Sequence, residues 1–75
     1  MANLPALSGR QVIRALERAG FRVVRTKGSH HIMKKDGHSN NVSVPVHGNQ
    51  PLKIGTLRNV IRQAGMTEAE FLSYL

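Results

Sequence analysis

The sequence predicts a small α+β protein with its elements in the order α-β-β-β-α. Three observations lead to this prediction. Apolar residues recur at helical spacing near both ends of the chain, β-prone residues separated by turn signals fill its middle, and 75 residues suffice for one small core. The strands are therefore expected to form one three-stranded antiparallel sheet, with both main helices packed on one face and the other face open.

The first helix is expected to begin after Ser8, which can cap it. Gln11 completes a capping-box pattern three residues later, and Gly20 is expected to end the helix. The apolar stripe of this helix consists of Val12, Ala15, Leu16 and Ala19. Three arginines repeat every four residues and should form a basic ridge facing away from the core: Arg10, Arg14 and Arg18.

Three strands are expected over residues 21–27, 30–35 and about 41–46. A tight Gly28-Ser29 connection separates the first two, and turn-forming residues 36–40 predict a hairpin between the second and third. In the third strand three valines alternate with other residues, which places them on one face. Pro45 cannot donate a ladder hydrogen bond, so it favours an edge position or a strand end.

A second amphipathic helix follows the loop at residues 47–51. Its inward residues are predicted to be Ile54, Leu57, Val60, Ile61 and Ala64, with Arg58 and Arg62 outward and Gly65 at its end. Thr67 and Glu70 form another capping box, which predicts a short final helix that offers Phe71, Leu72 and Leu75.

The charge of the chain points to an anionic partner. Eleven Lys and Arg residues against four Asp and Glu residues give a formal charge of +7, which suits nucleic acid or an acidic protein. The chain has no cysteine, which excludes disulfides and thiolate zinc sites. No apolar run approaches the roughly 20 residues of a membrane span. We therefore expect a cytoplasmic protein that does not bind membranes.

The segment Lys27-Gly28-Ser29-His30-His31 is the strongest candidate site. Histidine is the side chain best suited to moving protons near neutral pH, and glycine lets the backbone approach a phosphate. Lys27 adds a positive charge, and Ser29 adds a hydroxyl. A neutral imidazole here could remove the proton of a ribose 2′-OH and so cleave RNA. Neighbouring strand residues point to opposite faces, so the pattern leaves open which histidine faces solvent.

The other histidines give weaker signals. His47 follows the third strand and could orient or protonate the leaving oxygen, whereas His38 is expected to be a solvated turn residue. Carboxylates are too scarce to favour a metal site, and no cofactor is expected. A non-catalytic RNA-binding module and a pure interaction protein with a basic face remain the alternatives to a ribonuclease.

Five segments, in order and at close spacing, resemble the YcfA/HicA family of small toxins from HicA–HicB toxin–antitoxin pairs. They are Gly20-Phe21, Lys27-Gly28-Ser29-His30-His31, Val44-Pro45-Val46-His47-Gly48, Lys53-Ile54-Gly55-Thr56-Leu57 and Gln63-Ala64-Gly65. The resemblance implies a double-stranded-RNA-binding-domain-like fold, with residues 1–75 forming one HicA-like toxin domain. It also implies an mRNA interferase, which is a metal-independent endoribonuclease toxin.

The resemblance assigns roles to particular residues and partners. It implies that His30 is the catalytic histidine and that His31 is the less important neighbour. The match of Val44 to Gly48 places His47 in the surroundings of the site, so His47 joins Lys27, Gly28 and Ser29 as a candidate for binding RNA or its phosphate. The implied partners are mRNA, as the substrate, and a HicB-like antitoxin that covers the toxin and occludes the histidine.

Overall fold

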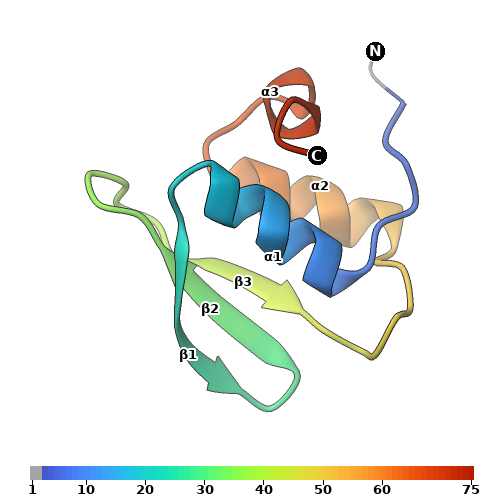
Figure 1. Cartoon of the computed structure of the whole chain (residues 1–75), viewed down its shortest axis with the longest axis horizontal. Coiled ribbons are helices and arrows are strands. Elements are labelled where there is room, and N and C mark those ends of the chain that lie inside the picture. The colour runs from blue at the N-terminus through green and yellow to red at the C-terminus, as the bar shows by residue number, and fades with distance from the viewer. Residues whose placement is uncertain (1–2) are drawn as a thin grey trace.

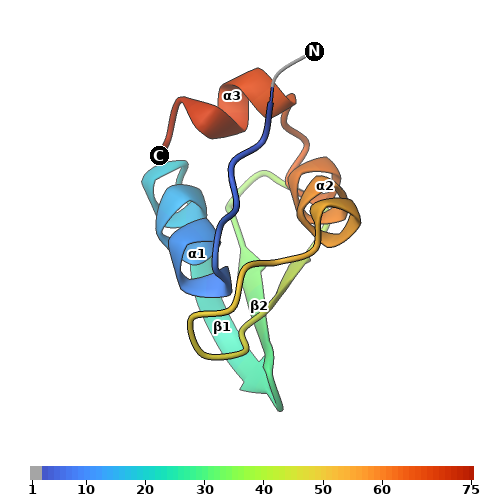
Figure 2. The ribbon, with the colours of Figure 1, turned by 90° about the vertical axis from the view of Figure 1, so that its right-hand side faces the viewer.

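The computed structural model describes residues 3–75 and confirms the predicted α+β architecture (Figure 1). The three strands form one antiparallel sheet in the order β1-β2-β3, and α1 and α2 lie side by side on one of its faces (Figure 2). The short α3 lies beyond α1 and α2, on their side away from the sheet. The elements are α1 (Gly9–Arg18), β1 (Arg22–Lys27), β2 (His30–Lys34), β3 (Val42–Pro45), α2 (Ile54–Gln63) and α3 (Glu68–Leu72).

The start of α1 forms as its sequence predicts. The Ser8 N–H donates to Oε1 of Gln11 at 2.9 Å, and the Gln11 N–H donates to Oγ of Ser8 at 3.3 Å. This capping box satisfies two backbone donors that have no partner within the helix. Gly20 follows the helix with a φ of 104°, a left-handed conformation that glycine adopts without strain.

The core lies between the two main helices and the inner face of the sheet. Ile54 is an exception to the predicted α2 stripe, because it is 48 % exposed. Ile54 lies on the same side of the helix as Ile61. It is, however, the first residue of α2, and the core does not extend to that end of the helix. The buried apolar residues are Leu7, Val12, Ala15, Leu16, Ala19, Phe21, Met33, Val42, Val44, Leu57, Val60, Ile61, Ala64 and Phe71.

The first strand is more exposed than its apolar residues suggest. Phe21 is buried but precedes the strand, while Val23 and Val24 are 37 % and 43 % exposed. The pairing with β2 shifts between Val23 and Arg25, so Val24 forms a bulge. The helices pack on β3, and the β1–β2 hairpin extends past them (Figure 1). The outer end of this hairpin is therefore accessible to a ligand.

The end of β3 is fixed by close contact with the start of α1. Pro45 is the last residue of an edge strand, as its missing N–H predicts. Gly9 packs directly on the backbone of Pro45 and on the side chain of Val46. The absence of a side chain at Gly9 is what allows α1 to approach β3 this closely.

Replacing Gly9 with alanine is expected to destabilise the protein by about 1–3 kcal/mol, the usual cost of overpacking. A Cβ at this position would overlap the carbonyl oxygen of Pro45 and lie 2.9 Å from Cγ2 of Val46. The carbonyl belongs to the backbone, so it cannot rotate away. Urea unfolding of the wild type and the variant measures the change.

Gly55→Ala is the matched control, because Gly55 is also helical but has no atom within 4 Å of its Cβ position. Alanine favours helix over glycine by about 1 kcal/mol, so this variant is expected to be as stable as the wild type or more so. A Gly9→Ala protein as stable as Gly55→Ala would contradict the packing argument.

The short α3 is held by its cap and by one large side chain. The Thr67 N–H donates to Oε1 of Glu70 at 2.9 Å, and the Glu70 N–H donates to Oγ1 of Thr67 at 3.1 Å. The backbone N–H of Thr67, which donates to the Glu70 carboxylate, is the main cause that holds the pKa of Glu70 below its usual range, and the Thr67 side chain acts in the same direction. Phe71 is fully buried and anchors the helix to the core.

Candidate functional site

The β1–β2 turn lies against the end of β3. His30 pairs with Pro45, and the Val46 N–H donates to the carbonyl oxygen of Ser29 at 2.7 Å. His47 follows Val46 directly, so its backbone lies at the same end of the sheet as the turn. The structure thus brings together the two segments that sequence analysis selected, the Gly-Ser-His-His turn and the segment that contains His47.

Strand pairing decides which histidine faces solvent, the question that the sequence left open. Met33 is fully buried on the helix side of β2, and His31 lies two residues earlier on the same side. The partner of His31 in β3 is Val44, which is also fully buried. His30 therefore faces the open side of the sheet, where it is exposed.

The open side of the sheet around His30 is strongly basic. Lys27 is the direct partner of His30 in β1, and Arg25 and Lys34 occupy the same face farther along the strands. Among the described residues these three cations take part in no ion pair. Arg22, on the same face, forms an exposed pair with Asp36 at 3.2 Å. The surface of Arg25, Lys27 and Lys34 is called the basic sheet face below.

The turn beside His30 leaves room for a ligand. Gly28 has a φ of 59°, and nothing lies within 4 Å of the position that a Cβ would occupy. Its backbone is therefore open to close approach by a phosphate. The next residue, Ser29, is half-buried, and its carbonyl oxygen is used by Val46. Lys27, Gly28, Ser29 and His30 thus form a continuous segment beside the open face.

His31 carries a ring nitrogen without a hydrogen-bond partner, a feature that no sequence pattern predicts. Its side chain is half-buried, and its Nδ1 is buried with no hydrogen-bond partner. A buried polar atom without a partner costs about 1–3 kcal/mol, so such atoms are rare in folded proteins. His31 is accordingly a second imidazole in this segment that a substrate group or a water molecule could engage.

The prediction for His38 was wrong. The residue is half-buried, and its Nε2 lies 2.8 Å from the carbonyl oxygen of Gln63. Its ring also packs edge-on against Phe21, with ring centres 5.4 Å apart. The β2–β3 turn folds back onto the end of α2, which shields part of the His38 ring from solvent and gives the residue a structural role. His47, by contrast, is exposed.

The described residues form neither a metal-binding cluster nor a membrane-spanning helix. Within residues 3–75, no three His, Asp or Glu side chains are grouped so that they could hold a metal ion. None of the helices in that part of the chain has the length and apolar character needed to cross a membrane.

Comparison with known proteins identifies the family. The family described as the HicA toxin of bacterial toxin–antitoxin systems matches residues 9–66, more than half of the chain. The chain belongs to the HicA toxin family. The match begins at α1 and includes both the β1–β2 turn and the segment through His47. As a HicA toxin, the protein is the toxin of a toxin–antitoxin system, and this implies an antitoxin partner. No curated protein matched the chain.

Proposed function

We propose that this HicA toxin is a metal-independent endoribonuclease that cleaves mRNA, with His30 as its proton-transferring group. The position of His30 carries the proposal. It is exposed on the open side of the sheet, opposite Lys27 and two residues after the accessible Gly28 turn. This arrangement offers a proton acceptor, a positive charge and an open backbone at one place.

The proposed reaction begins at a ribose 2′-hydroxyl. The neutral imidazole of His30 accepts the proton, and the 2′-oxygen attacks the adjacent phosphorus. The bond from phosphorus to the 5′-oxygen breaks, which leaves a 2′,3′-cyclic phosphate on one product and a 5′-hydroxyl on the other. The departing oxygen must gain a proton, for which His47 is the proposed donor because it lies at the same end of the sheet.

The phosphate would be held by the residues around the turn. Lys27 would neutralise a phosphoryl oxygen, and the backbone at Gly28 and the hydroxyl of Ser29 would contact it from the turn. The rest of the basic sheet face would attract the adjoining phosphates, so binding should weaken steeply as salt is raised. Cleavage of mRNA places the activity in the cytoplasm, and a HicB-like antitoxin would suppress it.

Regulated expression in bacteria tests the proposed function. Induction of the chain is expected to arrest growth and to fragment mRNA, and co-expression of a HicB-like antitoxin should restore growth and keep mRNA intact. A gene with an early frameshift controls for the burden of expression. Unimpaired growth with intact mRNA, at a protein level confirmed by blotting, would overturn the proposal.

A further inference from the structure

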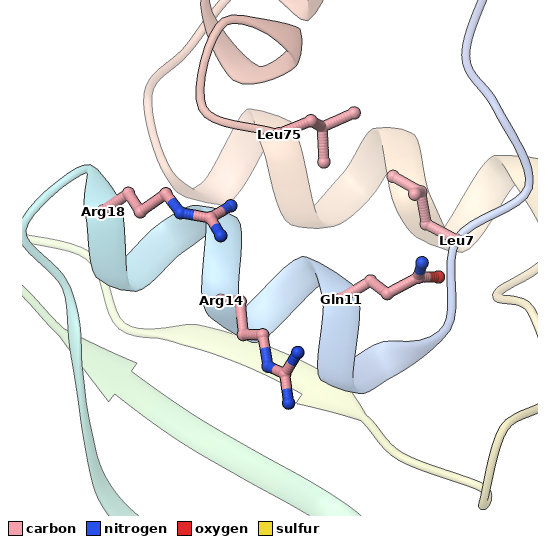
Figure 3. A pocket seen from close by; sticks show the side chains of 5 residues that line it. All are labelled: Leu7, Gln11, Arg14, Arg18 and Leu75. Atoms are coloured by element: carbon pink, nitrogen blue, oxygen red, sulfur yellow. The ribbon is translucent and has the colours of Figure 1, made fainter.

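We propose that a small pocket on the outer side of α1 is a docking site for the antitoxin, occupied by an acidic segment that carries an apolar side chain. The inference rests on the proposed function only in taking an antitoxin as the partner. The pocket lies between α1, the segment that leads into α1 and the residues that follow α3, and Figure 3 shows the five side chains that line it: Leu7, Gln11, Arg14, Arg18 and Leu75.

The pocket combines apolar and cationic walls. Leu7 and Leu75 lie on one side, and Leu75 is 49 % exposed although it is a large apolar residue. Arg14 and Arg18 come from α1 on the other side. The Arg18 guanidinium donates to the carbonyl oxygen of Tyr74 at 2.9 Å, which holds it beside the pocket before any partner binds. Apolar contact and charge can therefore be offered to the same ligand.

The dimensions favour side chains over a metabolite. The pocket has a volume of about 250 Å³, below the roughly 300–1,000 Å³ of typical small-molecule sites. A space of this size suits one or two side chains of a protein partner, and an apolar side chain seated on Leu75 would remove that residue from water.

Charge complementarity selects an acidic partner. In the described part of the chain neither Arg14 nor Arg18 forms an ion pair, and Arg10 continues the ridge one turn earlier. A carboxylate placed between the two guanidiniums would form charge-assisted hydrogen bonds that are stronger than neutral ones. The antitoxin segment is accordingly expected to carry Asp or Glu next to its apolar residue.

The location of the pocket separates it from the proposed RNA site. Figure 2 shows α1 and α2 together on one side of the sheet. The pocket is lined by residues of α1 and by Leu7 and Leu75, whereas strand pairing places His30 and the basic sheet face on the opposite, open side of the sheet. RNA bound across the open side would not reach Leu75. The apolar walls also suit a protein segment better than a phosphate backbone. Antitoxin docking at this pocket and RNA cleavage should therefore respond to different substitutions.

Titration of the purified toxin with its antitoxin by calorimetry tests this inference. Arg14→Glu and Leu75→Asp are each expected to weaken binding by about tenfold or more, as substitutions at energetically important interface residues do. Arg62→Glu makes the same charge change as Arg14→Glu, but on the exposed side of α2. Its affinity for the antitoxin should stay within about twofold of the wild-type value. All three variants should cleave RNA at the wild-type rate.

Each alternative outcome has a distinct meaning. Wild-type affinity in both pocket variants would overturn the docking site. Reduced RNA cleavage with unchanged antitoxin affinity would also overturn the docking site, and it would show that the basic ridge of α1 binds RNA. If the wild-type toxin itself does not bind the antitoxin, the antitoxin is not its partner, and the proposed function fails together with the docking site. Thermal unfolding of each variant confirms that losses of affinity do not come from unfolding.

Discussion

Replacing His30 with alanine is expected to lower the rate of RNA cleavage by about 10²–10⁴-fold, the usual contribution of a positioned general base. The side chain is exposed on the open face, and no hydrogen bond in the described structure depends on it. Its removal should therefore change the free energy of unfolding by no more than about 0.5 kcal/mol. Single-turnover cleavage of an oligoribonucleotide in EDTA, together with urea unfolding, gives both quantities.

His31→Ala is the matched control for this prediction, because it removes the neighbouring imidazole from the opposite face. We expect it to retain more activity than His30→Ala, since the proposed phosphate contacts lie around His30. The reverse result, an active His30→Ala protein and an inactive His31→Ala protein, would contradict the assignment. It would transfer the proton-transfer role to the imidazole whose buried Nδ1 has no partner.

Replacing Phe71 with alanine is expected to destabilise the protein by about 3–5 kcal/mol, the usual range for a buried phenylalanine. Phe71 is fully buried and is the one fully buried side chain of α3, a helix of five residues. Because a helix this short has little stability of its own, the packing of Phe71 must hold it in place. Total stabilities of 5–15 kcal/mol are typical of small domains, so the loss would be a large share.

Leu72→Ala provides the comparison, because Leu72 is the next residue of α3 and is only half-buried. Its truncation should cost clearly less than that of Phe71, since fewer contacts are lost. Urea unfolding of both variants measures the difference. Equal losses would show that Phe71 does not anchor α3 in the way its burial indicates.

The helices could be predicted well because their signals are local. Ser8 with Gln11 and Thr67 with Glu70 each form the capping box that their spacing predicts, and Gly20 follows α1 in the left-handed conformation. A cap involves residues that are neighbours in the sequence, so no knowledge of the tertiary fold is needed.

The strands were harder to predict because their faces depend on partners. The alternation of His30, His31 and Met33 fits either orientation, and only pairing with Val42 and Val44 places Met33 inside. The bulge at Val24 likewise depends on register with β2. His38 was misjudged for the same reason, since Gln63, its hydrogen-bond partner, is distant in sequence.

The candidate site itself was found from sequence, but its surroundings were not. The motif around Gly28 identified the turn, whereas the basic sheet face emerges only when the strand register aligns Arg25, Lys27 and Lys34 on one side. The pocket beside α1 brings Leu7 and Leu75 together from near the two ends of the chain. No local pattern contains that information.

Cleavage of RNA by the purified chain in EDTA, with analysis of the product ends, is the decisive test of the proposed ribonuclease. Wild-type protein is expected to cut an oligoribonucleotide and to leave a 2′,3′-cyclic phosphate and a 5′-hydroxyl, while a substrate with 2′-deoxyribose at the cleaved position stays intact. RNA that is bound in a salt-dependent manner but remains uncut would overturn the catalytic role of His30 and indicate a non-catalytic RNA-binding module.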